Sequence, residues 1–177
     1  MAWSHFDTCA RGRTDAIFNQ GMSLPMELKL VRTADGLRLA RFPVKELECL
    51  RRGEATALKS FEGELAEVEF SCVPVADAVV TLDLRGVMVE YDAVKKTLSV
   101  NGRAAAWDLD AAGRLGLRVF VDRVGLEIFS LDGLQFIPVT DILPDPANRK
   151  LSWRASGAKK PVRDVTERAW RLKSAVR

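Results

Sequence analysis

Carboxylate side chains near the middle of the chain are the first candidates for chemistry. Asp122, Glu127 and Asp132 follow one another closely along a β-rich stretch. Glycoside hydrolysis uses two carboxylates roughly 5 to 10 Å apart, and such a pair could form here. Asp122 and Asp132 stand at the ends of apolar runs, however, where aspartate commonly closes a turn through its own backbone. We therefore predict structural roles for these carboxylates and assign no catalytic residue.

Three aromatic side chains are candidates for binding a carbohydrate. Tyr91, Trp107 and Trp153 are large, and an aromatic face matches the C–H face of a pyranose or furanose ring. Together they could form a platform on which a sugar stacks. The alternative is that each packs in the core, because large aromatics dominate the interiors of β-sandwiches. The residue types leave both interpretations open.

Other reactive groups form no recognisable site. His5 is the only histidine, and no serine or cysteine partner can be placed beside it from the sequence. Cys9, Cys49 and Cys72 are odd in number and far apart, which argues against a disulfide framework and a zinc site. The sequence contains no glycine-rich phosphate loop and no metal-ligand cluster. We expect neither a metal nor another cofactor.

The carboxylates belong to a stretch that predicts three consecutive antiparallel strands. Apolar runs fill residues 115–140 and are separated by turn signals at residues 122–125 and 132–133. The Asp132-Gly133 pair is typical of a primed two-residue turn, which needs positive φ. Residues of the first run alternate in polarity. Four of its aliphatic side chains should therefore share one buried face: Leu115, Leu117, Val119 and Val121.

Similar alternating runs occupy most of the remaining chain. We predict further strands at residues 22–31, 37–42, 65–73, 78–84, 87–92, 96–100, 103–109, 151–155 and 162–172. Residues 22–42 should form one hairpin, and Asn101-Gly102 is the signal for another. Pro138 removes a ladder donor, so its strand should lie at an edge or carry a bulge. Residues 43–52 suit either a short helix or an extended crossover, of which we favour the crossover loop.

The spacing of the runs predicts an all-β fold, a two-sheet antiparallel β-sandwich of the jelly-roll or concanavalin-like type. The 177 residues, of which 47% are hydrophobic and 29% charged, are ordinary for one globular domain. We place an N-terminal arm at residues 1–18 and the sandwich at residues 19–177. No apolar run is long enough to span a bilayer, and the N-terminus lacks the features of a secretory signal. The sequence does not indicate a compartment.

The net charge of +3 is mild but unevenly placed. Basic residues recur between Arg149 and Arg177, and a nucleic-acid footprint is one interpretation of them. The same charges alternate with apolar side chains such as Leu151 and Trp153, which is typical of the solvent-facing side of outer strands. No recognisable nucleic-acid-binding motif accompanies them. We expect neither nucleic-acid binding nor membrane binding.

A family resemblance extends these inferences. Residues 122–129, Asp-Arg-Val-Gly-Leu-Glu-Ile-Phe, resemble the Asp-Arg-Ser-Ser-Val-Glu-Val-Phe type of signature in the C-terminal β-sandwich module of glycoside hydrolase family 32. That family contains the levanases, inulinases and invertases. Agreement continues, in order, through residues 18–30, 33–39, 43–48, 143–149 and 171–175. The first three of these segments resemble the run by which those enzymes pass from a catalytic propeller into the sandwich.

The resemblance implies a non-catalytic sandwich module whose parent enzymes hydrolyse fructan or sucrose. Those enzymes carry a nucleophile, an acid/base glutamate and a stabilising aspartate on a five-bladed propeller, for which this chain has no room. Glu48-Cys49 imitates the catalytic Glu-Cys pair of the family but matches the beginning of the sandwich, so we transfer no role to it. We expect the chain alone to be inactive and to support a propeller structurally.

Two further expectations concern partners. The chain could instead be a stand-alone carbohydrate-binding module for fructan or another glycan, with the three aromatic residues as its binding surface. Trp3 and Phe6 resemble the tail of the last propeller strand without its neighbours. Because an unpaired apolar strand tends to pair, we predict that residues 1–18 either dock back on the sandwich or mediate self-association.

Overall fold

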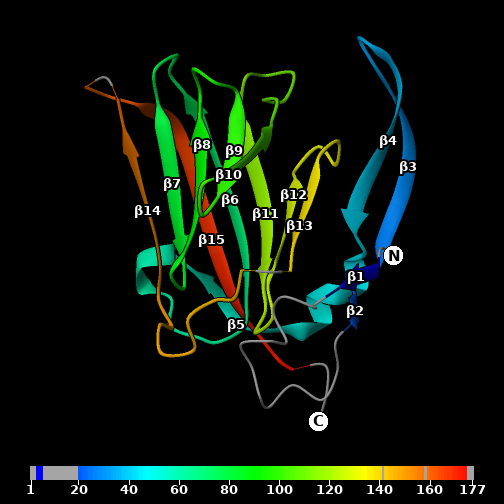
Figure 1. Cartoon of the computed structure of the whole chain (residues 1–177), viewed down its shortest axis with the longest axis vertical. Coiled ribbons are helices and arrows are strands. Elements are labelled where there is room, and N and C mark those ends of the chain that lie inside the picture. The colour runs from blue at the N-terminus through cyan, green and yellow to red at the C-terminus, as the bar shows by residue number, and fades with distance from the viewer. Residues whose placement is uncertain (1–2, 6–19, 141, 158, 175–177) are drawn as a thin grey trace.

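The body of the molecule consists of two antiparallel sheets (Figure 1). The computed structural model describes residues 3–5, 20–140, 142–157 and 159–174. One sheet contains five strands: β7 (Val79–Leu84), β8 (Val87–Asp92), β9 (Thr97–Val100), β10 (Arg103–Ala106) and β14 (Leu151–Ser156). The other contains six: β5 (Arg51–Thr56), β6 (Ala66–Pro74), β11 (Leu115–Val121), β12 (Leu126–Ser130), β13 (Phe136–Val139) and β15 (Val162–Leu172).

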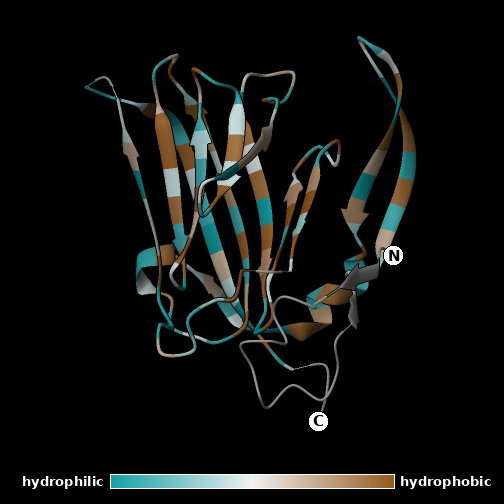
Figure 2. Ribbon diagram, viewed as in Figure 1, coloured by the Kyte–Doolittle hydropathy of each residue, from teal (hydrophilic) through white to brown (hydrophobic). Residues whose placement is uncertain are grey.

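The two sheets pack face to face, which confirms the predicted all-β sandwich. The strand orders are β10-β9-β8-β7-β14 and β13-β12-β11-β6-β15-β5. Every second side chain of a strand points to the inner face, and Figure 2 shows the resulting alternation of apolar and polar residues. The four aliphatic residues predicted to share a face of β11 are all buried there. Side chains from β7 and β8 complete the same core, among them Leu82, Leu84 and Val89.

The central meander is confirmed, but one of its turns differs from the prediction. Strands β11, β12 and β13 pair consecutively, and β13 with Pro138 lies at the edge of the sheet, as its missing donor requires. The Asp132-Gly133 turn is longer than the predicted two residues, and of the pair only Gly133 has positive φ, at 76°. The Asp132 carboxylate explains this, because it accepts hydrogen bonds from Ser130 Oγ (2.6 Å) and Leu134 N (3.0 Å) and so stabilises a wider loop.

A buried arginine forms the turn between β7 and β8. Arg85 and Gly86 both have positive φ, 58° and 87°, as a primed two-residue turn requires. The Arg85 side chain is 1% exposed and donates to the carbonyl oxygens of Glu64 (2.6 Å), Asp145 (3.0 Å) and Asn148 (2.9 Å). Its guanidinium therefore joins two loops that are far apart in the sequence.

The crossover loop favoured for residues 43–52 is wrong. The chain forms a 3₁₀ helix, η1 (Lys45–Leu50), and then enters β5 at Arg51. Short-range backbone bonds hold the helix, from Leu47 N to Val44 O (3.2 Å) and from Arg51 N to Glu48 O. The alternative of a short helix was the better interpretation of the apolar spacing.

A hairpin of β3 (Met26–Thr33) and β4 (Gly36–Pro43) stands beside the six-stranded sheet (Figure 1). The predicted hairpin is confirmed. Two backbone N–H groups attach its base to the meander: Leu24 N donates to the Glu127 carboxylate (2.9 Å), and Arg41 N donates to Gly133 O (2.7 Å). These described hydrogen bonds to the meander thus lie near one end of the hairpin.

The N-terminal arm is described in part. β1 (Trp3–His5) pairs with β2 (Gln20–Met22). Residues 6–19 lie outside the described residues, so the arm's predicted docking or self-association and the boundary near residue 18 stay predictions. Within the described parts of the chain, no helix combines the length and apolar character needed to cross a membrane.

Candidate functional site

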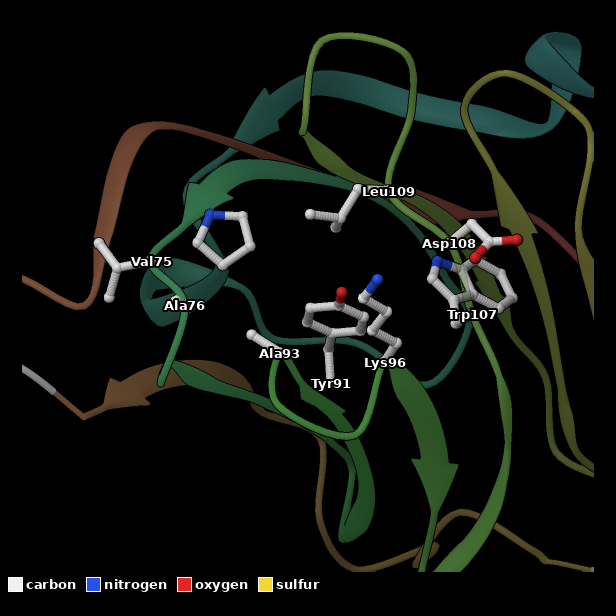
Figure 3. A pocket seen from close by; sticks show the side chains of 9 residues that line it. Val75, Ala76, Tyr91, Ala93, Lys96, Trp107, Asp108 and Leu109 are labelled. Carbon is white, nitrogen blue, oxygen red and sulfur yellow. The ribbon is translucent and has the colours of Figure 1, made fainter. Parts of the chain in front are cut away.

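A pocket at one end of the sandwich contains two of the three aromatic residues singled out from the sequence. It has a volume of about 430 Å³ and lies where β6, β8 and β10 end and β9 begins. Tyr91 and Trp107 line it together with Lys96, Asp108 and several apolar side chains (Figure 3). Its volume is within the range of about 300–1,000 Å³ that small-molecule sites occupy. The pocket is therefore a candidate for a small-molecule binding site.

The two aromatic side chains offer the pocket their polar edges. Tyr91 is 2% exposed and Trp107 is 1% exposed, so neither ring face is free for stacking. Figure 3 shows the Tyr91 hydroxyl and the Trp107 indole nitrogen directed toward the pocket, as is the Lys96 ammonium. Burial raises the pKa of Tyr91, and the Asp108 and Asp92 carboxylates add to the effect. The hydroxyl is therefore protonated at neutral pH and can donate a hydrogen bond.

Trp153 lies elsewhere, on the inner face of β14. It pairs with Leu82 of β7 and packs on Phe70 with ring centroids 5.1 Å apart. It is half-buried against the core and does not line the pocket. The structure thus brings Tyr91 and Trp107 together without Trp153, and a platform of all three does not form in this arrangement.

Two of the candidate carboxylates close turns, as the sequence predicted. The Asp122 carboxylate accepts a hydrogen bond from Arg123 N (2.6 Å) at the β11–β12 turn. Asp132 organises the loop at the other end of β12 through Ser130 and Leu134. The two lie at opposite ends of one strand, so they do not form a pair for acid–base work.

Glu127 is the third candidate and lies at the base of the hairpin. One carboxylate oxygen accepts the Leu24 N–H, and the other is buried without a hydrogen-bond partner among the described residues. Burial raises the pKa of Glu127 to about 6, against the lowering effect of the Leu24 N–H. An elevated carboxyl pKa is a property of general acids. Here the carboxyl holds the hairpin instead of facing the pocket.

An arginine–glutamate cluster on the outer face of the six-stranded sheet was not predicted. Glu67 of β6 is fully buried and accepts two hydrogen bonds from Arg51 and one from Arg118, each at 2.7 Å. The Arg51 guanidinium lies 4.0 Å above the centre of the Trp170 ring. The only signal in the sequence was a glutamate on either side of Val68 in an apolar strand. The pairing register, which the sequence does not reveal, assembles the cluster.

The hairpin carries an apolar face that the rest of the described chain leaves exposed. Residues directly opposite in an antiparallel pair share a face, and the register pairs Leu30 with Leu39 and Arg32 with Leu37. Four leucines therefore lie on one side, which we call the leucine face: Leu28 (57% exposed), Leu30 (68%), Leu37 (57%) and Leu39 (43%). The opposite side of the hairpin carries Phe42, which contacts the meander at Gly133.

The remaining reactive groups form no site in the described part of the chain. Glu48 and Cys49 are exposed on η1, where Glu48 pairs with Arg51 at 3.7 Å. His5 has its backbone in β1, and its side chain lies outside what the structure describes. No group of three or more histidine, cysteine, aspartate or glutamate side chains that could hold a metal occurs among the described residues.

Comparison with known proteins relates the chain to fructan- and sucrose-hydrolysing enzymes. It is 30% identical to a levanase of Bacillus subtilis over 179 aligned positions, which cover 81% of this chain and 26% of the levanase. No family model matches the chain. The chain therefore spans about a quarter of the length of this levanase.

Solved structures share the fold. An exo-inulinase from Aspergillus awamori matches with a TM-score of 0.73 at 15% identity, covering 91% of this chain and 37% of that one. A β-fructofuranosidase of glycoside hydrolase family 32 from Bombyx mori matches with a TM-score of 0.61 at 18% identity, covering 88% and 34%. A sucrose-6-phosphate hydrolase from Lactobacillus gasseri matches with a TM-score of 0.60 at 20% identity, covering 84% and 33%. In each case the match spans about a third of the longer protein.

Proposed function

Because this chain is a domain related to the enzymes of glycoside hydrolase family 32, we propose that it is a non-catalytic β-sandwich module of a levanase-like enzyme. In this role it packs against a catalytic propeller, which is not among these 177 residues, and stabilises it. The relationship gives the domain a fructan- and sucrose-hydrolase context.

The leucine face is the observation that carries this proposal. Contiguous exposed apolar patches mark sites of protein interaction, and complete burial of one leucine contributes about 1.5–3 kcal/mol. By contrast, the outer face of the five-stranded sheet carries polar side chains such as Thr97, Ser99 and Arg154. A supporting module gains more by covering the leucine face than by covering this polar face.

The carboxylates support the view that the chain itself performs no hydrolysis. Asp122 and Asp132 are engaged in turns, and Glu127 is engaged by Leu24 N. A glycosidase needs two carboxylates on either side of the scissile bond. Purified chain is therefore expected to leave sucrose, levan and inulin intact, and hydrolysis by the pure protein would contradict the non-catalytic role.

Complementation in trans tests the supporting role. The probe is a fragment of the Bacillus subtilis levanase that lacks the 26% matched by this chain. We expect the full 177-residue chain to raise the Tm of the fragment and its rate of levan hydrolysis. The variant Leu28→Ser/Leu30→Ser should lose both effects, because it removes apolar area from the proposed contact.

A matched control separates the leucine face from apolar exposure in general. Val94 is 70% exposed in the turn between β8 and β9, away from the hairpin, so Val94→Ser should complement like the wild type. If the wild-type chain neither stabilises nor activates the fragment, or if the leucine variant does so equally well, the supporting role is contradicted.

A second candidate function is glycan binding. The specific observation in its favour is that Tyr91 and Trp107 share a pocket of small-molecule size with a cationic and an anionic side chain. Trp153 does not line that pocket, so of the three aromatic residues only Tyr91 and Trp107 would contact a glycan there. Calorimetric titration of the chain with a fructan series tests it, and the absence of heat with every glycan would contradict it.

A further inference from the structure

We infer that the pocket binds the terminal one or two units of a neutral sugar chain. The ligand is held by hydrogen bonds from the polar edges of the pocket side chains. This inference rests on the proposed glycan binding and adds the class of ligand, the mode of binding and the residues that select it. Those residues are Tyr91, Trp107, Lys96 and Asp108.

Hydrogen bonds within the protein hold the walls of the pocket in place before any ligand arrives. Trp107 N donates to Lys96 O (3.0 Å), which joins the two sides of the rim. The side-chain amide of Gln135 donates to Asp108 O (2.8 Å) and accepts from Asp108 N (2.7 Å), so the meander fixes the position of Asp108. Ala93 N donates to Ala78 O (3.0 Å) on the opposite wall. A preformed site of this kind loses little entropy on binding.

The polar groups directed at the pocket have no protein partner. Among the described residues, no hydrogen bond or ion pair occupies the Tyr91 hydroxyl, the Trp107 indole N–H or the Lys96 ammonium. Lys96 also adopts a positive φ of 52°, a conformation that costs a non-glycine residue energy. Neither the Tyr91 hydroxyl nor the Trp107 indole nitrogen is among the buried polar atoms that lack a partner in the described chain, so both reach the solvent in the pocket. A ligand in the pocket can replace this water as their hydrogen-bond partner.

The balance of charge selects a neutral polyhydroxyl ligand. Lys96 and Asp108 place one positive and one negative group beside the pocket, with the ammonium directed into it and the carboxylate turned away from its centre (Figure 3). An anionic ligand would gain from the ammonium and lose against the carboxylate, and a cationic ligand would do the reverse. A sugar hydroxyl can donate to the Tyr91 hydroxyl oxygen and accept from the Lys96 ammonium or the Trp107 indole N–H. Apolar walls at Pro74 and Leu109 complement the C–H groups of a sugar ring.

The geometry also limits how much of a glycan can enter. The aromatic faces are covered, so a long polymer cannot lie stacked across them. Only a chain end can present several hydroxyl groups to edges that converge in a pocket of about 430 Å³. Affinity should therefore rise from one sugar unit to two and then stop rising.

Titration by NMR and tryptophan fluorescence tests this binding mode. The ligands are fructose, sucrose and levan oligosaccharides of increasing length, with fructose 6-phosphate as the charged comparison. We expect binding that saturates at two units, and weaker binding of the phosphate. Lys96→Met, Tyr91→Phe and Trp107→Phe each remove a donor while keeping most of the side-chain volume, and each should weaken binding by about tenfold or more.

Two matched variants provide controls. Lys95→Met removes the same charge from the neighbouring residue, which pairs with Asp92 and does not line the pocket. Trp153→Phe alters the aromatic residue that lies in the core. Both should bind sugar like the wild type. Thermal unfolding of every variant distinguishes lost binding from lost folding.

The possible results distinguish failure of this binding mode from failure of glycan binding itself. If no glycan binds the wild type, the proposed glycan binding itself fails. If glycans bind but Lys96→Met and Tyr91→Phe bind normally while Trp153→Phe does not, glycan binding stands and the pocket is the wrong site. If affinity keeps rising with chain length beyond two units, the end-binding mode is overturned.

Discussion

The Phe42 side chain lies against the backbone of Gly133, so that a β-carbon added at Gly133 would stand 2.6 Å from Phe42 Cζ. Gly133 O also accepts the Arg41 N–H of the same hairpin, at 2.7 Å. A turn residue of the sandwich and an aromatic residue of the hairpin thus form one contact. Gly133 serves both the loop, through its positive φ, and the docking of the hairpin.

Gly133→Ala should destabilise the domain more than a turn glycine alone would explain. The new methyl group meets the Phe42 ring, and overpacking of this kind costs about 1–3 kcal/mol. Gly102 is the control, because its φ of 85° is similar but nothing lies within 4 Å of an added β-carbon. Gly102→Ala carries only the backbone cost of about 1–2 kcal/mol. Urea unfolding compares the two, and equal losses would contradict the contact.

Glu127 should make stability depend on pH in a predictable direction. Its pKa of about 6 in the folded state lies above the ordinary value of 4.5. The folded protein therefore holds this proton more tightly, and its contribution to stability is lost as the pH rises from about 4.5 to about 6. The effect is on the order of 2 kcal/mol. Unfolding free energies from pH 4 to 7.5 should show the wild type falling relative to Glu127→Gln, and a constant difference would contradict the shift.

Arg85→Met should be among the most damaging single substitutions. It leaves the carbonyl groups of Glu64, Asp145 and Asn148 without their buried donor, and each buried polar group left unsatisfied costs about 1–3 kcal/mol. Arg154→Met makes the same chemical change on the exposed side of β14 and should alter stability by less than about 0.5 kcal/mol. Denaturant unfolding of both variants measures the difference. Similar stabilities would show that the three hydrogen bonds contribute little.

The thiols should differ sharply in reactivity. Cys72 is fully buried, and burial raises its pKa to about 12, whereas Cys49 is exposed on η1. In a Cys9→Ser background, a thiol reagent should modify Cys49 in the folded protein and Cys72 only after unfolding. Mass spectrometry of the peptides assigns the sites. Modification of Cys72 at the rate of Cys49 in the native state would contradict its burial.

Local patterns were sufficient to predict the sandwich, because the alternation of apolar and polar residues along a strand indicates which of its faces is buried. The alternation at Leu115 to Val121 and the Asn101-Gly102 turn are readable within a few residues, and both are confirmed. The failures have local causes as well. Apolar spacing at residues 43–52 could not distinguish a 3₁₀ helix from a crossover, and the Asp132 carboxylate widened a turn that glycine alone would have kept short.

The candidate site could be predicted only in part, because it depends on strand order. Tyr91 and Trp107 were identified by residue type, but their meeting with Lys96 needs the ends of three strands to converge. Trp153 has the same residue type and pairs instead with β7. Glu67 and Arg51 were missed because their strands are separated by β15 in the sheet, an order that no local pattern encodes.

The hairpin's attachment at one end has a thermodynamic consequence. Among the described strands, β3 forms ladder bonds with β4 and with no strand of the sandwich, so the hairpin can open without breaking the sandwich core. It should therefore form its own cooperative unit, with faster amide hydrogen exchange than β6 or β11. Any partner that covers the leucine face must also stabilise this unit. Binding at the hairpin and its local folding are for that reason a single coupled equilibrium.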